Sequence, residues 1–466
     1  MNRSRGVLVV VCAALAAGCG SSSPSPSGQR QQNVMVIDEG IDTSVSPLQG
    51  KIIGAYTEDC VDDSGSDSDA GIAGPDGAVD SGPMFDALKA AFIAAYQQPD
   101  DSCHLSPGIS AKPDPLASIE SFEARWNAAL LAGETPGNAF SASEIQQIET
   151  PIENEMNAFN YHGTATSSTV AHENPNVRLV LVERQLLSES QAQAAFDCFV
   201  QSDIDQLVDL LNDPDVFAAA ADQPATLDAD LADAMTKGNV GVVNESFGSA
   251  ARQSLEALQV QQNCPTTIDL SAYFTVLNAI TLAHDKTLTG PQVLTVQAAG
   301  NDGVEIDSGA DSLACDPGDP LSLLVGSYDP RTGAQNSFSN FGACVDVFAP
   351  GQDILVTYAG GWLFWADGTS FSTPLTVRAV SLDAPTPFMP GQAQAALVGM
   401  RDPTTHFLPV DLFPADVFYA PLQASTDLVI PRAAGVTAAA APHRVTQVDL
   451  HRVWGPLRRL RALRGR

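Results

Sequence analysis

The segment DGTSFSTP, residues 367–374, places Ser370 beside a glycine and a threonine, with a proline four residues further on. A serine at the start of a helix lies near free backbone N–H groups and the positive end of the helix dipole, and both stabilise developing negative charge. Such a serine can act as a nucleophile once a base removes its proton. The ordinary alternative is a serine that only caps the helix. The choice depends on partner residues elsewhere in the chain.

Apolar runs that alternate with helix-like stretches predict the elements that position these partners. Strands are expected at NVMVID, NVRLVLV, NVGVVNESFG, QVLTVQAAGND, LSLLVGSY and CVDVFAPG. This alternation indicates an α/β fold, a three-layer sandwich whose mainly parallel central sheet is flanked by helices and carries helical insertions. Functional side chains in such sheets gather at the carboxyl ends of strands. Asp38, residues 244–246 and Asn301 lie at such ends.

Four blocks, in order, resemble the signature segments of the subtilisin-like serine proteases, or subtilases. VMVIDEGID resembles the aspartate block, HGTATSSTVA the histidine block, VQAAGND the block with the oxyanion-hole asparagine, and SFSNFGACVDVFAPG with DGTSFSTP the approach to the nucleophile. Any one block recurs by chance, but all four in the order Asp, His, Ser are specific. The resemblance covers residues 33–383, with insertions at about 57–158 and 186–238.

The resemblance implies a serine endopeptidase that hydrolyses peptide bonds through an acyl-enzyme on Ser370. His162 would act as general base and then as general acid, and Asp38 would bind its other ring nitrogen. The Asn301 amide and the Ser370 backbone N–H would bind the oxyanion. This chemistry needs no cofactor. The alternative is a subtilase scaffold with weakened catalysis that serves as a peptide-binding or adhesion lipoprotein.

The same resemblance implies how a protein or peptide substrate would bind. NESFGS, residues 244–249, is similar to the edge strand that pairs with extended substrate in this family, and main-chain pairing demands little of the substrate's sequence. The residues expected to bind substrate and to wall the pocket next to the cleaved bond are Ser246, Phe247, Gly248, Ala298 and Gly300. An ordinary buried strand end is the other interpretation of these residues.

Three positions depart from the family's pattern. Ala165 stands where a second histidine is usual, TSS interrupts the usual HVAG run, and Glu39 follows Asp38 where Thr or Ser is common. The added carboxylate of Glu39 could raise the pKa of His162 or could point to solvent. His162 comes 124 positions after Asp38 because of a helical insertion. This insertion could cover the substrate cleft, or it could have no part in function.

The N-terminus and the charge balance bear on location and partners. Residues 1–18 carry two arginines and an apolar run too short to cross a bilayer, so they are predicted to be a signal peptide. LAAGC resembles a bacterial lipobox, which would leave Cys19 lipid-modified at the head of a Ser/Pro-rich tether over residues 19–32. An ordinary signal peptide cut nearby is the alternative. We expect an exported, membrane-anchored lipoprotein, on the periplasmic or surface face of a bacterial outer membrane, and otherwise a secreted protein.

A net charge of −32, from 55 acidic and 23 basic residues, disfavours nucleic acid as a partner. Calcium binding in the resembled family and the acidity of this chain both suggest structural calcium, whose ligands the sequence does not identify. Residues 384–466 form a Pro/Ala-rich extension with the basic tail GPLRRLRALRGR. That tail could dock on an anionic membrane or on the acidic body, but a frayed terminus is the default expectation.

Six cysteines remain when the predicted signal and lipidation positions are set aside: Cys60, Cys103, Cys198, Cys264, Cys315 and Cys344. An even number in an exported protein predicts up to three disulfides among fifteen possible connectivities. Resemblance to proteinase-K-like relatives implies a bridge between Cys315 and Cys344. Cys60–Cys103 would then close the insertion, and Cys198–Cys264 would remain.

Overall fold

The computed structural model describes residues 31–60, 83–111, 114, 116–132, 134, 136–148, 151, 161–184, 198–247, 251–261, 264, 268–289, 292–313, 315–383, 388–418, 456–457 and 459–461. In these ranges no helix combines the length and the apolar character needed to cross a membrane.

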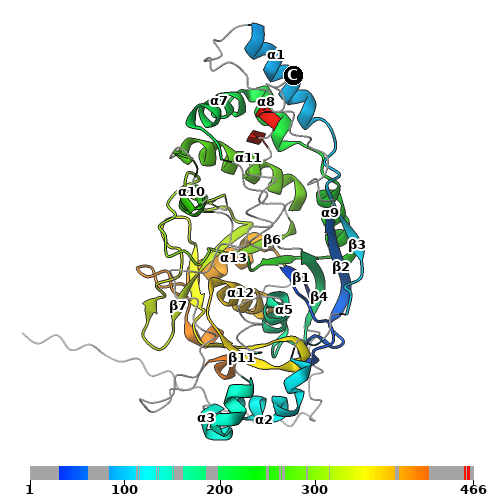
Figure 1. Ribbon diagram of the computed structural model, residues 1–466, viewed down its shortest axis with the longest axis vertical. Coiled ribbons are helices and arrows are strands. Elements are labelled where there is room, and N and C mark those ends of the chain that lie inside the picture. Colours follow the sequence, from blue (N-terminus) through cyan, green and yellow to red (C-terminus); the bar gives the residue numbers. More distant parts are fainter. Residues whose placement is uncertain are drawn as a thin grey trace, which may run out of the picture. The chain divides into compact units, whose positions relative to one another are not determined.

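A nine-stranded sheet lies at the centre of the described residues (Figure 1). Its order is β3-β2-β4-β1-β5-β6-β7-β8, and β9 also pairs with β7. The β2/β3 and β7/β8 pairs are antiparallel and the other pairs are parallel. The strands are β1 (Gln32–Glu39), β2 (Ile52–Cys60), β3 (Cys103–Pro107), β4 (Val177–Arg184), β5 (Val242–Glu245), β6 (Leu294–Ala298), β7 (Ser322–Asp329), β8 (Ala334–Gln335) and β9 (Val347–Pro350).

Helices cover both faces of this sheet. The helices are α1 (Pro83–Tyr96), α2 (Glu120–Leu131), α3 (Pro136–Ala139), α5 (His162–Ala171), α7 (Gln201–Leu211), α8 (Pro214–Ala221), α9 (Thr226–Gly238), α10 (Arg252–Gln261), α11 (Ser271–Thr289), α12 (Thr369–Asp383) and α13 (Pro390–Met400). Helices α5 and α12 pack against each other on one face, as Figure 1 shows. Helix α9 packs on the other face, against β2, β3 and β4.

The alternating residues of β1 explain the layers. Val34 and Val36 are fully buried in the core shared with α5 and α12, whereas Met35 and Ile37 are buried in the core shared with α9. Side chains of a strand point to opposite faces in turn, so a strand that is apolar at every position must be covered on both sides. This confirms the predicted three-layer α/β sandwich.

The first insertion, expected to be helical, also contains strands that were not predicted. Cys103–Pro107 forms β3, which pairs with β2. The disulfide between Cys60 and Cys103 links two residues that face each other in this ladder, so the bridge and the register hold the segment extended. The bridges Cys198–Cys264 and Cys315–Cys344 form as well, and all three predicted pairings are confirmed.

The first insertion also supports the segment that leads into Ser370. A hairpin of β10 (Ile354–Thr357) and β11 (Leu363–Ala366) runs directly into α12. On α2, Trp126 Nε1 donates to the Leu363 carbonyl at 2.9 Å, and Asn127 bonds both the Gly361 carbonyl and the Leu363 N–H. Trp126 also packs against Trp362. The described part of the insertion therefore braces this hairpin.

Helices α1, α7, α8, α10 and α11 share a separate apolar core, which we call the helical lobe. The C-terminal residues 456–457 and 459–461 belong to it: Leu457 and Leu460 are fully buried there. The Arg461 guanidinium lies 4.2 Å from the centre of the Phe199 ring and donates to the Cys198 carbonyl at 2.7 Å. The default expectation of a frayed tail is thus wrong for these residues, because apolar and cationic contacts both hold them on the acidic body.

We expect Leu460→Asp to destabilise the helical lobe, since it would bury a carboxylate among apolar side chains. Loss of a buried leucine side chain alone costs about 2–5 kcal/mol. The check is urea unfolding of the full chain, with Val260→Asp as control, because Val260 is a 64% exposed residue of α10 in the same lobe. Equal midpoints for the two variants would contradict the docking of the tail.

Asp346 is a half-buried carboxyl immediately before β9. Its Oδ2 accepts the Leu324 N–H at 2.8 Å, and its backbone N–H bonds the Leu324 carbonyl at 3.0 Å. Burial raises the pKa of this carboxyl to about 6, against the opposing effects of the Leu324 hydrogen bond and of Arg401. Because the folded pKa lies above the ordinary value, the carboxyl favours folding when protonated. That contribution is present below about pH 4 and is lost as pH rises through about 6.

Asp346→Asn should remove this pH dependence, because the amide oxygen can still accept the Leu324 N–H and carries no charge. Relative to wild type, the variant should gain stability between pH 4 and 7, on the order of 2–3 kcal/mol. The measurement is the difference in free energy of unfolding between the two proteins at each pH. A difference that stays constant from pH 4 to 7 would refute the assignment.

Candidate active site

Asp38 and His162 meet where a strand ends and a helix begins. Asp38 lies at the carboxyl end of β1, and His162 is the first residue of α5. The imidazole Nδ1 is 2.7 Å from Asp38 Oδ1. Only 2% of the Asp38 side chain and 12% of the His162 side chain are exposed. An ionised carboxylate only accepts, so Nδ1 carries the proton of this bond and a neutral ring keeps a basic Nε2.

Two further donors hold the Asp38 carboxylate. The Glu39 backbone N–H donates to Oδ1 at 2.8 Å, and the Thr166 hydroxyl donates to Oδ2 at 2.8 Å. Thr166 lies four residues after His162 on α5 and is fully buried. The prediction missed Thr166, although its helical spacing from His162 was a signal. The TSS departure from the family's pattern therefore places a hydroxyl on the carboxylate.

Gly163 permits the close approach of α5 to the end of β1. A Cβ atom at this position would lie 2.5 Å from the Glu39 carbonyl oxygen and 2.6 Å from Ile41 Cγ1. Thr164 also connects the helix to the chain after β1, because its hydroxyl donates to the Gly40 carbonyl at 2.9 Å. Only glycine after His162 lets the helix start this near the strand, so the Asp38–His162 distance depends on it.

Ser370 lies in the first turn of α12 and is 9% exposed. Its hydroxyl donates to the Ser246 carbonyl at 2.7 Å. Because a hydroxyl has one proton, this bond directs the proton to Ser246 rather than to His162. The His162 ring nevertheless lies 5.7 Å from the ring of Phe371, the next residue of α12. The structure thus brings the serine and the imidazole into one neighbourhood, with the hydroxyl turned to the end of β5.

Asn301 lies beside the start of α12. Its Oδ1 accepts both the Thr369 N–H and the Thr369 hydroxyl at 2.9 Å, which leaves the amide Nδ2 on the other side. A Cβ on Gly368 would lie 3.5 Å from Asn301 Nδ2 and 3.6 Å from the Ser370 backbone nitrogen. Both nitrogen atoms therefore lie within 3.6 Å of one point beside Gly368.

The predicted substrate residues lie at two neighbouring strand ends. Ser246 and Phe247 follow β5, Ala298 ends β6 and is fully buried, and Gly300 follows it with φ of 99°. Gly248 and the predicted lipidation site Cys19 lie outside the described residues.

The comparison of residues 244–249 to a substrate-pairing edge strand stays a prediction, because only its first two residues lie in β5. That strand pairs with β1 on one side and β6 on the other over residues 242–245, so its backbone hydrogen bonds are already satisfied. Any main-chain pairing with substrate would have to begin beyond Glu245, where these ladders end.

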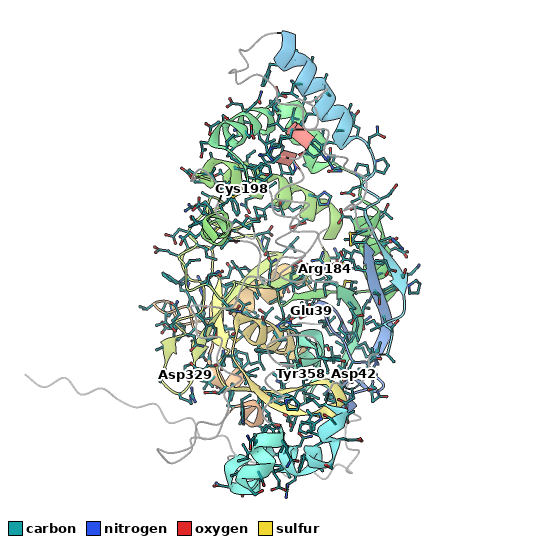
Figure 2. The ribbon with its side chains drawn as sticks, in the orientation of Figure 1. Glu39, Asp42, Arg184, Cys198, Asp329 and Tyr358 are labelled. Atoms are coloured by element: carbon teal, nitrogen blue, oxygen red, sulfur yellow. A yellow bond between two sulfur atoms is a disulfide. The ribbon has the colours of Figure 1, made fainter. Side chains whose placement is uncertain are left out.

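Arg184 lies across from the extra carboxylate next to Asp38 in the sheet. The register of β1 and β4 places Arg184 opposite Glu39, and Figure 2 shows both at this end of the sheet. Arg184 Nε also lies 3.4 Å from Glu58 Oε2, and its guanidinium stacks 5.0 Å from the centre of the Phe247 ring.

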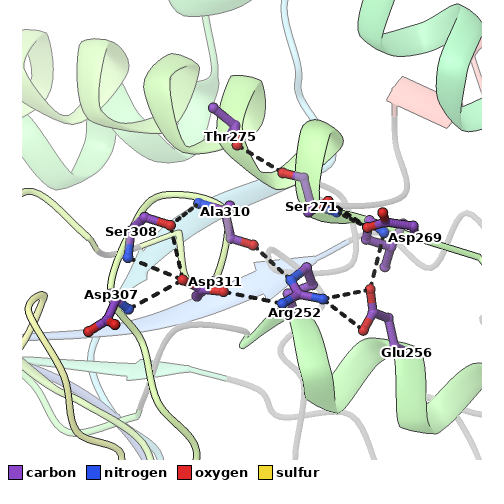
Figure 3. Close-up of polar contacts among 10 residues, drawn as sticks. Arg252, Glu256, Asp269, Ser271, Thr275, Asp307, Ser308, Ala310 and Asp311 are labelled. Atoms are coloured by element: carbon purple, nitrogen blue, oxygen red, sulfur yellow. Dashed lines mark hydrogen bonds and ion pairs between the residues drawn. The ribbon is translucent and has the colours of Figure 1, made fainter.

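Arg252 connects the chain after β5 with the chain after Asn301 (Figure 3). From the start of α10 it donates to the Ala310 carbonyl at 3.0 Å, pairs with Glu256 at 3.0 Å and pairs with Asp311 at 3.2 Å. Asp311 in turn accepts the N–H groups of residues 307 and 308. This network braces the two chain segments that follow the predicted substrate residues.

Two clusters of potential metal ligands occur among the described residues. One contains Glu58 with two cysteines that are disulfide-bonded and so cannot bind a metal. The other contains His172, Glu173 and Asp416, beside a cavity of about 360 Å³. Arg378 lies 3.8 Å from Glu173 and supplies a competing cation. This set does not fit calcium, which takes six to eight oxygen ligands, so structural calcium stays a prediction.

Comparison with known proteins identifies the family of this chain. The model of the subtilase family matches residues 29–398, which is most of the chain. This chain belongs to the subtilase family.

Curated relatives of the subtilase match over short stretches. Alkaline protease 1 of Aspergillus clavatus is 38% identical over 102 residues, 22% of this chain and 23% of that protein. Alkaline serine exoprotease A of Vibrio alginolyticus is 33% identical over 132 residues, 24% of each chain. Subtilisin BL of Lederbergia lenta is 35% identical over 94 residues, 20% of this chain and 32% of that protein. The first two matches thus span about a quarter of the relatives' own length.

Solved structures match more of the chain at lower identity. A cold-adapted subtilisin-like serine proteinase is 17% identical, with 81% of this chain and 84% of that chain covered and a TM-score of 0.36. A lanthipeptide protease is 15% identical, with 79% and 80% covered and a TM-score of 0.37.

We expect Thr166→Val to slow the reaction of Ser370 with a fluorophosphonate by about tenfold, because a hydrogen bond to a charged group contributes about 1.5–3 kcal/mol. Thr166→Ser, which keeps a hydroxyl, should restore most of the rate. Thr169→Val is the matched control, since Thr169 is also buried on α5 but its hydroxyl bonds the Ala165 carbonyl. Equal rates for the two valine variants would show that the Thr166 hydroxyl does not serve Asp38.

Proposed function

We propose that this subtilase is a serine endopeptidase that hydrolyses peptide bonds through an acyl-enzyme on Ser370. The observation that carries the proposal is the 2.7 Å bond between Asp38 and His162, two residues 124 positions apart. Ser370 at the start of α12 and Asn301 beside it supply the other groups that acyl transfer requires. Each residue type alone is common at strand ends and helix starts, but together they match the parts of one reaction.

In the first half of the reaction, the Ser370 hydroxyl turns from the Ser246 carbonyl to His162 Nε2. The imidazole takes its proton as the oxygen attacks the scissile carbonyl carbon. Asp38 holds the resulting imidazolium through Nδ1. The carbonyl oxygen becomes an oxyanion, which accepts hydrogen bonds from Asn301 Nδ2 and the Ser370 N–H.

In the second half, the tetrahedral intermediate collapses and the carbon–nitrogen bond breaks. His162 gives its proton to the leaving amine, and the acyl group stays on Ser370 as an ester. A water molecule then attacks the ester with His162 as base, and the same oxyanion donors serve again. The Ser370 hydroxyl regains its proton as the carboxylic acid departs.

The proposal extends to substrate and location. Protein or peptide substrates would lie along the chain beyond Glu245 and against the end of β6, with main-chain bonds giving most of the binding. The chain would be exported through the predicted signal peptide and held at a membrane by lipid on Cys19. A fully buried Ala298 favours a pocket that is closed at this strand end.

A fluorophosphonate probe should label the wild-type protein and fail to label Ser370→Ala. The same substitution should abolish casein digestion, since losing the nucleophile removes covalent catalysis and lowers turnover by about 10⁶-fold, a magnitude measured in subtilisin. Circular dichroism of both proteins controls for folding.

The result also separates the two candidate functions. The contact that favours a weakened enzyme is the Ser370 hydroxyl bonded to the Ser246 carbonyl. A folded wild-type protein that neither reacts with the probe nor cleaves casein, yet binds extended peptides, would overturn the endopeptidase proposal and support the peptide-binding alternative.

A further inference from the structure

The loop that carries Asn301 lies on the segment Asn336–Phe341. The Asn340 N–H donates to the Gly300 carbonyl at 3.0 Å, and the Phe341 N–H donates to the Val304 carbonyl at 3.1 Å. The Gly303 N–H also donates to the Phe338 carbonyl at 2.8 Å. These backbone hydrogen bonds involve residues before and after Asn301. They hold the loop to the segment Asn336–Phe341, while Asn301 itself is exposed.

The side chain of Asn340 bonds the same loop at four points. Its Nδ2 donates to the Ala299 carbonyl at 2.8 Å and to Asp302 Oδ2 at 3.2 Å. Its Oδ1 accepts the Asp302 N–H at 3.0 Å and the Val304 N–H at 3.1 Å. An amide offers two donors and two acceptor sites, so the capacity of Asn340 is used in full by the residues around Asn301.

Gly300 leaves space for the Asn340 side chain, whose four hydrogen bonds to the loop we call the Asn340 clamp. A Cβ at residue 300 would lie 2.5 Å from Asn340 Nδ2, and its φ of 99° is one that side-chain-bearing residues rarely adopt. Asn340 itself is fully buried. Part of the requirement for glycine next to Asn301 is therefore the packing of the Asn340 amide.

Asn340 is also fixed from the side of the sheet. The preceding Ser339 accepts the Ser327 N–H of β7 at 2.8 Å through its hydroxyl. Asn336 donates to the Ser327 hydroxyl at 2.7 Å, and its N–H bonds the Ser327 carbonyl at 3.0 Å. A continuous set of hydrogen bonds thus runs from β7 through residues 336–340 to the loop around Asn301.

We propose that Asn340 is a positioning residue that sets the place of the Asn301 amide and thereby the oxyanion donor. This inference rests on the proposed function. Oxyanion stabilisation requires a donor at hydrogen-bond distance from the charge that develops, and misplacement by about 1 Å can cost about 100-fold in rate. Asn301 is held on one side by Thr369 on α12 and on the other by a loop whose polar groups converge on Asn340.

The test compares Asn340→Ala with Asn174→Ala. Asn174 is an equally buried asparagine whose amide donates to the Ser381 hydroxyl, beyond the end of α5 opposite His162. Both variants should lose stability. Only Asn340→Ala should lower kcat, by about 10–100-fold with KM within about twofold, because a misplaced oxyanion donor affects the transition state. Asn340→Ser, which keeps one polar group, should fall between Asn340→Ala and wild type and serves if Asn340→Ala does not fold.

A double-mutant cycle with Asn301→Ala shows whether Asn340 acts through Asn301. In the Asn301→Ala background, the Asn340 substitution should change kcat by less than about threefold, since the group it positions is gone. Independent losses that multiply, or equal kcat losses for Asn340→Ala and Asn174→Ala, would overturn the proposal.

Hydrogen exchange tests the clamp without catalysis. Asn340→Ala should lose protection at the amides of Asp302 and Val304, and Asn174→Ala should keep it. Unchanged protection in Asn340→Ala would overturn the inference. A wild-type protein without peptidase activity would instead refute the proposed function, and the exchange result would still decide whether Asn340 holds this loop.

Discussion

The site depends on the hydrogen bond between the Asp38 carboxylate and the His162 imidazole. It forms only if the end of β1 and the start of α5 lie within one side-chain length of each other. Gly163 makes that approach possible, because any Cβ there would meet the Glu39 carbonyl. Thr166 and the Glu39 N–H then restrain the carboxylate from other directions. A buried charge is tolerated only when it is paired and bonded in this way, so the same contacts serve both folding and chemistry.

The other reactive groups follow from the ends of neighbouring elements. β5 and β6 lie next to each other in the sheet, and their carboxyl ends bring Ser246 near the loop of Asn301. Helix α12 packs against α5 and presents Ser370 with its first free N–H groups. In the proposed mechanism the two helices differ in role: α5 carries the base, and α12 carries the nucleophile and one oxyanion donor. Parallel strands and helix starts thus concentrate polar groups at one edge without burying unpaired ones.

The insertions and the tail extend this core. Helix α2 holds the β10–β11 hairpin that leads into Ser370, whereas the helical lobe builds a second apolar core. The buried leucines at positions 457 and 460 complete that core, with Arg461 stacked on Phe199. The described residues of the basic tail therefore dock on the acidic chain itself, and local attraction between opposite charges accompanies apolar burial.

The sequence alone predicted the layers and the strands, because apolar periodicity is a property of neighbouring residues. Its resemblance to the subtilases implied the four polar residues of the site and the Cys315–Cys344 bridge, and the other two disulfides followed from the cysteines that remained. It could not predict that residues 103–107 form a strand or that the Ser370 hydroxyl bonds the Ser246 carbonyl. Nor could it predict that Thr166 bonds the Asp38 carboxylate and Asn340 the loop around Asn301. Each of these depends on contacts between residues far apart in the chain. Which of many polar side chains meets a given carboxylate or loop is decided by packing in three dimensions, and only the tertiary structure contains that information.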